Sequence, residues 1–225
     1  MGNVASQKQL REKEASLEQA AKQVAGLQNE LVQKQTWIAV LEKEIKNSRQ
    51  PAAPQKKLLR AQPLAELSVD AVKKMLQEKG LFDIDYNKSG KGLQHQYEAS
   101  EQGGEKLVSD HATGLMWQQS GSPNSMTYAD AEKYVHELNA KKFAGYNDWR
   151  LPTLEEAMSL MEPAWKNGNL YIEPVFDKKQ QRIWTIDQEN AGVAWSVSFG
   201  GGYCYGNAVL YIAHVRAVRA GQSIL

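Results

Sequence analysis

Side chains able to act as a nucleophile or a general base are few in this sequence and lie far apart. A nucleophilic enzyme needs an activated serine or cysteine, a base and a group that orients the base. The chain has a single cysteine, Cys204, and no histidine in a recognisable catalytic motif; the histidines are His95, His111, His136 and His214. Cys204 lies in an alternating segment typical of a buried strand, with a Cys204–His214 pair as the minor alternative. We therefore expect no enzymatic activity.

Signals for metals and cofactors are weak. A single cysteine excludes an intrachain disulfide and a multi-cysteine zinc site. The glycines at 200–202 precede a strand-like pattern, whereas a phosphate-binding loop requires a helix there. Residues 83–94 resemble a calcium loop, in which oxygen-bearing side chains occupy the first, third and fifth positions: Asp85, Asn87 and Ser89. Gln96 replaces the glutamate that usually closes the calcium shell, so a polar turn is favoured over a structural calcium site and no cofactor is expected.

The C-terminal segment WSVSFGGGYCYGNAVLYIAHVRAVR, residues 195–219, is typical of a binding surface. At its start Trp195, Val197 and Phe199 alternate with small residues, which places the two sets on opposite faces of a strand. Paratopes use Tyr, Ser, Gly and Asn, because tyrosine gives contact area at low entropic cost and the small residues adapt. We expect ligand contacts from the outward face, made by Ser196, Ser198, Gly200, Gly201, Tyr203, Tyr205, Asn207, Leu210, Tyr211, Ala213 and His214. A buried strand pair without a binding role is the alternative.

Composition argues against two classes of partner. The 225 residues carry a net charge of +1, so no basic field is available to bind nucleic acid. No apolar run approaches the ~20 residues that span a bilayer. No hydrophobic signal-peptide region follows residue 1, which favours the cytoplasm if that residue is the native start; otherwise the localisation is open. The expected partners are a protein or glycan ligand and further copies of the chain.

Residues 1–50 predict an α-helical coiled coil. Apolar residues recur every seven positions as a heptad seam: Leu10, Leu17, Val24, Leu31, Ile38 and Ile45. The companion positions three residues later hold two leucines and three residues that pack less well in such a seam: Leu27, Leu41, Lys13, Ala20 and Lys34. Because a lone helix of this kind is marginal in water, we expect self-association through residues 10–45. Dimer and trimer are both open, and a solvated single helix is the alternative.

The remaining chain divides into three parts. Residues 51–67 are a predicted linker, because their prolines cannot continue a helix. Residues 68–105 hold a short helix and a polar lead-in, with Ser68 as the N-cap of the helix and Gly80 as its end. Residues 106–225 have the pattern of one compact mixed domain.

This last domain is predicted to be α+β. One helix begins after Thr127, with Asp130 in a capping-box arrangement. A second begins after Thr153, with Glu156 at the matching position, and ends at Pro163. Short strands are predicted in KLVSDHATGLMW, IWTID, AWSVSF, YCY and HVRAVR. Two helices and short strands together favour helices packed on antiparallel strands.

A consistent series of segments in this domain carries a family resemblance: VSDHATGLMWQ, MTYADAEKYVHELN, GYNDWRLPTLEEA, NLYIEPVF and the terminal VRAVR. Together they resemble the Lcl C-terminal domain family, named for a bacterial collagen-like adhesin. Its members are similar to the formylglycine-generating-enzyme branch of the C-type lectin fold, so the resemblance implies a C-type lectin-like domain that binds a ligand. The enzymatic relatives oxidise their substrate through cysteines, and with Cys204 alone such an enzyme is the least favoured alternative.

The same resemblance implies a source of variation. Some proteins of this fold are targets of diversity-generating retroelements, which rewrite adenines and so randomise chosen codons. A randomised Asn codon never yields Lys, Glu, Gln, Met or Trp, and none of these occurs between residues 196 and 214. A diversified ligand-binding protein is therefore expected, with a fixed-specificity adhesin or glycan-binding domain as the alternative.

Overall fold

The computed structural model describes residues 2–48 and 58–221 of the chain. Two compact units follow one another, Met1–Pro54 and Gln55–Leu225, and each is described by itself. Residues 51–57 of the predicted linker lie outside the described residues.

The described part of the first unit is one helix, α1 (Gly2–Ser48). This confirms the predicted helix, while its assembly with other copies stays a prediction. In the single chain the seam is exposed at each described position: Leu17, Val24, Leu27, Leu31, Ile38 and Leu41. The side chains of Leu10 and Ile45, which complete the predicted seam, lie outside the described ones. Among the described residues, no helix has both the length and the apolar character that crossing a membrane requires.

The second unit begins its regular structure with α2 (Val69–Lys79). The Ser68 hydroxyl accepts the N–H of Ala71 at 3.3 Å, and Gly80 ends the helix with a left-handed φ of 66°. Val72 and Leu76 lie fully buried on the inner face of the helix. Both predicted ends are confirmed, because capping depends on residues adjacent in sequence.

Helix α3 (Tyr128–Ala140) starts at the predicted position, after Thr127. The Thr127 hydroxyl accepts the Asp130 N–H at 3.4 Å. The Asp130 carboxylate accepts that hydroxyl at 2.8 Å, where a full capping box would take the Thr127 backbone N–H. A short 3-10 turn, η1 (Phe143–Gly145), follows the helix.

Helix α4 (Leu154–Ser159) carries the predicted capping box, formed by Thr153 and Glu156. Its predicted end at Pro163 is wrong, because the helix stops at Ser159. The chain then turns away, and the Glu162 N–H donates to the carbonyl of Tyr171 at 3.0 Å.

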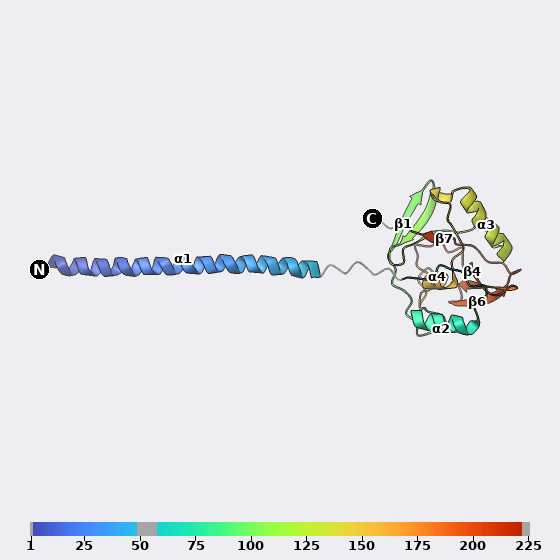
Figure 1. The fold of residues 1–225 in the computed structure, drawn as a ribbon, viewed down its shortest axis with the longest axis horizontal. Coiled ribbons are helices and arrows are strands. Elements are labelled where there is room, and N and C mark those ends of the chain that lie inside the picture. Colours follow the sequence, from blue (N-terminus) through green and yellow to red (C-terminus); the bar gives the residue numbers. More distant parts are fainter. Residues whose placement is uncertain (1, 49–57, 222–225) are drawn as a thin grey trace. The chain divides into compact units, whose positions relative to one another are not determined.

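The described strands form two antiparallel sheets, one ordered β1-β2-β3-β7 and the other β4-β5-β6. Their bounds are β1 (Tyr97–Gln102), β2 (Glu105–Asp110), β3 (Leu115–Gln118), β4 (Arg182–Asn190), β5 (Val193–Ser198), β6 (Tyr203–Ala208) and β7 (Val218–Ala220). Strand β7 pairs with β3, so the C-terminal VRAVR segment completes the first sheet. The α+β class is thus confirmed (Figure 1).

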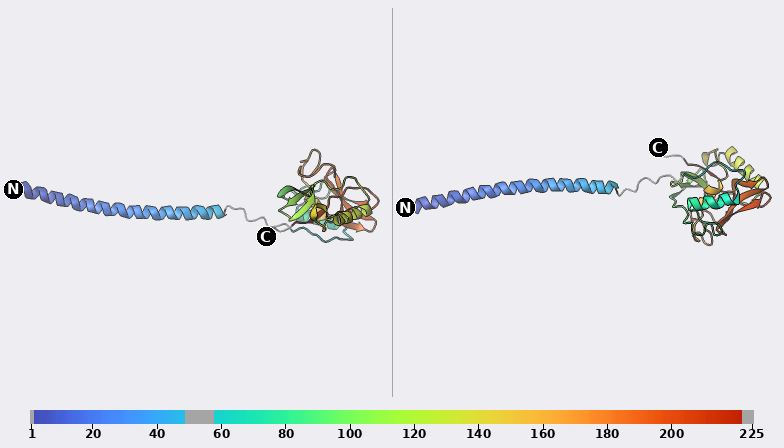
Figure 2. Two further views of the ribbon diagram at one scale, coloured as in Figure 1. Left: turned by 90° about the horizontal axis from the view of Figure 1, so that it is seen from above. Right: turned by 60° about the horizontal axis from the view of Figure 1, so that its bottom comes forward.

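Buried tryptophans form the centre of the second unit, and each is at most 2% exposed: Trp117, Trp149, Trp184 and Trp195. One apolar cluster joins α2 and α4 to β5, and a second joins α3 to β4. Accordingly α2 and α3 lie on opposite sides of the unit, with β4 and β6 between them (Figures 1 and 2). The three-stranded sheet is therefore packed on both faces over much of its area.

The NDWRLPT segment acts as scaffold that joins several elements. The Asp148 carboxylate accepts two bonds from the Arg219 guanidinium, at 2.6 and 3.1 Å. Arg150 binds buried Glu156 through both terminal nitrogens at 2.6 Å. Because Glu156 also caps α4, this ion pair fixes the segment to the start of that helix.

Candidate ligand-binding face

The residues predicted to bind ligand lie on β5, on β6 and in the loops that follow these strands. Some are exposed: Gly200, Tyr205, Leu210 and Tyr211. Others are half-buried: Gly201, Tyr203 and His214. The rest are buried: Ser196, Ser198, Asn207 and Ala213. The structure therefore brings part of the predicted set to the surface and places the remainder in the interior.

The expectation that Ser196 and Ser198 face outward is wrong, because both faces of β5 are covered. The Ser196 hydroxyl accepts the side-chain amide of Asn207 at 2.7 Å and donates to the carbonyl of Tyr205 at 3.4 Å. The Ser198 hydroxyl accepts the N–H of Gly201 at 3.2 Å. These side chains hold the β5–β6 hairpin together, which leaves them unavailable to a ligand.

The loop after β6 presents large apolar side chains to solvent. Leu210 is 82% exposed, Ile212 56% and Tyr211 44%. Ala213 is buried, contrary to expectation, because its N–H donates to Met126 and its carbonyl accepts the Met126 N–H, at 3.1 and 2.8 Å. The loop is thus anchored at its end while the preceding side chains protrude.

Arg182, the first residue of β4, lies among the tyrosines of this region. It donates to the hydroxyl of Tyr211 at 2.9 Å and to that of Tyr203 at 3.1 Å. Its guanidinium carbon lies 5.4 and 5.9 Å from the two ring centroids, within cation–π range. Sequence reasoning missed Arg182, because only the pairing of β4 with β5 and the return of the loop bring residues 182, 203 and 211 together.

We call this surface the tyrosine–arginine face and define it by Arg182, Tyr203, Tyr205, Leu210, Tyr211 and Ile212. Tyr203 and Tyr205 project to the same side of β6, since side chains alternate along a strand. Tyr205 is 57% exposed. The ring of Tyr203 lies over Gly201, where an added Cβ would overlap it, so this glycine makes room for the tyrosine. The face thus combines tyrosine rings and a held cation with the exposed aliphatic side chains of Leu210 and Ile212.

The surroundings of Cys204 and of His214 shift the pKa of both side chains. Burial raises the pKa of the Cys204 thiol well above its usual value, and the negative charge of Asp83 raises it further. Burial lowers the pKa of His214, and so do the positive charges of Lys179 and Arg216. No hydrogen bond joins Cys204 to His214 among the residues that the structure describes.

The predicted calcium-like segment is held by hydrogen bonds within it and by bonds to residues outside it. One oxygen of the buried Asp83 carboxylate accepts the N–H groups of Asp85 and Tyr86, each at 2.9 Å. The Asn87 amide donates to the carbonyls of Leu76 and Leu81 at 3.0 and 2.8 Å. Within the described ranges no cluster of three or more His, Cys, Asp and Glu side chains is arranged to hold a metal ion.

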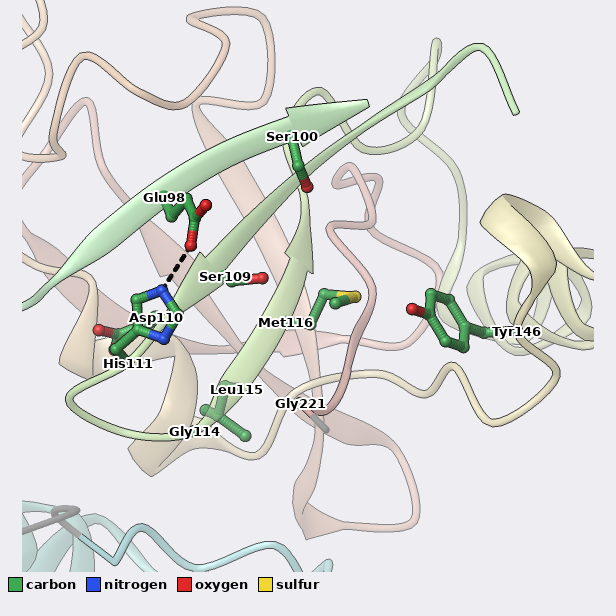
Figure 3. Close-up of a pocket in the computed structure, with 10 residues that line it drawn as sticks. All are labelled: Glu98, Ser100, Ser109, Asp110, His111, Gly114, Leu115, Met116, Tyr146 and Gly221. Atoms are coloured by element: carbon green, nitrogen blue, oxygen red, sulfur yellow. Dashed lines mark hydrogen bonds and ion pairs between the residues drawn. The ribbon is translucent and has the colours of Figure 1, made fainter. Parts of the chain in front are cut away.

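A separate pocket of about 400 Å³ lies against strands β1, β2 and β3. Met116 lines the pocket, and Tyr146 extends toward it from another part of the chain (Figure 3). At its edge the His111 ring bonds the Glu98 carboxylate at 2.7 Å. None of the predicted site residues lines this pocket, and in the described chain no hydrogen bond links His111 to a serine hydroxyl.

Fold and site together define an α+β domain that presents an exposed aromatic and cationic surface. The family model for the Lcl C-terminal domain matches residues 106–219, just over half of the chain. The chain belongs to this family, which confirms the resemblance inferred from its segments. No curated protein gives a significant match to the chain.

Proposed function

We propose that this protein binds a protein or glycan ligand through the tyrosine–arginine face, displayed on a C-type lectin-like scaffold. The observation that carries the proposal is that Tyr205, Leu210 and Ile212 are exposed and lie next in the chain to Tyr203 and Tyr211, whose hydroxyls hold the Arg182 guanidinium. Exposed apolar surface bordered by polar groups is typical of interaction sites. Buried Trp184 and Trp195, on strands β4 and β5, belong to the core of the unit that carries the face.

Diversification by a retroelement is part of this proposal. Variation is tolerable where a side chain reaches solvent, as at Tyr205, Leu210 and Tyr211. At Ser196 and Asn207 it would remove hydrogen bonds that hold the hairpin. A near-copy of the 3′ coding end beside a reverse-transcriptase gene, differing only at adenines that encode the exposed positions, would support diversification. Absence of such a near-copy would favour the alternative, a fixed-specificity adhesin or glycan-binding domain.

Self-association through residues 10–45 is the second part of the proposal. The seam residues of α1 are exposed in the single chain, and burying them between copies would remove that apolar surface from water. Several linked binding faces would convert weak single contacts into avidity. The number of copies stays open between two and three.

The experiment that tests the binding role uses the full chain and two probe sets, a display library of random linear peptides and a glycan array. Probes that bind the wild type are then measured on the triple variant Tyr205→Ser, Leu210→Ser and Ile212→Ser. We expect at least about a tenfold loss of affinity, because each truncation removes exposed apolar contact area.

A matched control is Leu58→Ser, since Leu58 is 89% exposed and does not belong to the face. It should bind the selected probes as the wild type does. Thermal unfolding should be alike for all three proteins, because exposed substitutions change stability little. Unchanged affinity of the triple variant, or no binder from either probe set, would reject the proposed function.

A further inference from the structure

Among the residues that the structure describes, the groups that position the Arg182 guanidinium are neutral. Its terminal nitrogens donate to Tyr203 and Tyr211, and in the part of the chain that the structure describes it forms no ion pair with a carboxylate. By contrast, Arg60, Arg150 and Arg219 each bind an acidic side chain. Arg182 therefore carries a positive charge that no carboxylate among the described residues pairs.

The two tyrosine hydroxyls extend this donor group. Each hydroxyl oxygen accepts a bond from Arg182, which leaves its own O–H free to donate elsewhere. The guanidinium has five N–H groups, of which these two bonds use two, so further donors remain on the same centre. A group that only accepts hydrogen bonds fits this array, and a carboxylate forms the strongest such bonds with arginine.

The chain next to Arg182 adds positive charge. Lys178 and Lys179 are exposed, and neither forms an ion pair among the described residues. The one acid nearby in sequence, Asp177, accepts the backbone N–H of Lys179 at 2.8 Å. Residues 177–182 thus carry three cations and one anion, although the whole chain is nearly neutral at +1. This local excess favours an anionic ligand.

The apolar part of the face narrows the ligand class further. Leu210 and Ile212 are aliphatic and protrude beside Tyr211, and their natural complement is another apolar side chain. A sugar stacks well on tyrosine rings but offers little to these branched aliphatic groups. Charge and apolar contact together indicate a polypeptide.

We propose that the tyrosine–arginine face binds an exposed peptide segment of a partner protein, in which an Asp or Glu side chain meets Arg182 and a neighbouring apolar side chain packs on Leu210 and Ile212. This inference rests on the proposed function and adds the class of ligand to it.

The test compares peptides selected on the full chain with their own neutral versions. Each selected acidic residue is changed to its amide, Asp→Asn or Glu→Gln, and affinity is measured for the wild type, Arg182→Gln and Arg182→Lys. We expect the selected peptides to be rich in acidic and apolar residues. Changing the peptide acid to its amide, or Arg182→Gln alone, should lower the affinity about tenfold, or 1.4 kcal/mol. The two losses should not add when combined, because both break the same ion pair. Arg182→Lys should bind with intermediate affinity, since it keeps the charge without the two-armed geometry.

Lys141→Gln, which removes an exposed cation at the end of α3, is the matched control and should leave affinity unchanged. Selected peptides that bind the face with an affinity unchanged by both Arg182→Gln and acid neutralisation would overturn this inference and leave the proposed function intact. Binding of glycans alone would also overturn it. Absence of any binder would reject the proposed function itself.

Discussion

Asp187 is expected to be the polar residue on which the stability of the second unit depends most. Its carboxylate is fully buried and accepts two bonds from Arg60, at 2.9 and 2.6 Å. It also accepts the N–H groups of Leu64 and Leu154, each at 2.7 Å. Because Leu154 is the first residue of α4, the anion also lies at a helix N-terminus, where negative charge is favoured. One side chain thus joins residues 60–64, α4 and β4.

The substitution Asp187→Ala would leave both N–H groups without their acceptor, at about 1–3 kcal/mol each. It would also break a buried ion pair, for which removal of one partner costs about 3–5 kcal/mol. Since these contributions overlap, we expect a loss of about 4–5 kcal/mol in the free energy of unfolding. Asp187→Asn keeps one acceptor oxygen and should lose about half as much.

Urea unfolding followed by tryptophan fluorescence measures this loss, because four tryptophans are buried in the second unit. Asp85→Ala is the matched control, since Asp85 is exposed, and it should change stability by less than about 0.5 kcal/mol. A loss below about 1.5 kcal/mol for Asp187→Ala would refute the reasoning, because it would mean that the three segments remain joined without the carboxylate.

Three other predictions concern acid stability, thiol reactivity and assembly. Burial would raise the pKa of Asp110, but hydrogen bonds from His95 and Thr113 and the charge of His95 lower it overall. Its stabilising contribution should therefore be complete above about pH 4 and lost as the pH falls through the lower folded-state pKa, so unfolding titrations should show a smaller acid dependence in Asp110→Asn. Burial raises the pKa of the Cys204 thiol, so the native protein should resist iodoacetamide at neutral pH and react only after unfolding. Mass spectrometry measures this labelling, and rapid labelling of the native protein would contradict the burial. Val24→Glu places a charge in the heptad seam, whereas Val32→Glu places the same charge outside it. Analytical sedimentation should show dissociation of the assembly for Val24→Glu alone. Identical behaviour of the two variants would contradict assembly through the seam.

The parts of the fold that the sequence predicts well depend on neighbouring residues. Ser68 and Gly80 delimit α2, and Thr153 with Glu156 starts α4, because caps form between residues at most four positions apart. The end of α4 could not be read in this way, since Glu162 bonds to Tyr171, which follows only after a loop.

The candidate site was harder to predict, because it depends on which strand faces other residues cover and on contacts between residues far apart in the sequence. Alternation places Ser196 opposite the apolar residues of β5, but it does not say whether the second face is also covered. Asn207 supplies that cover by bonding to Ser196. Arg182 and Ile212 carry no local signal, since their place on the face depends on how β4 and the loop after β6 meet.

Hydroxyl-radical footprinting of the full chain, with and without a selected peptide ligand, tests most directly whether the tyrosine–arginine face is the binding surface. The account predicts that the ligand lowers oxidation of Tyr205, Leu210 and Ile212, while Met116 and Tyr146 in the pocket on strands β1–β3 react as before. Protection of the pocket residues, with Tyr205, Leu210 and Ile212 unchanged, would contradict it.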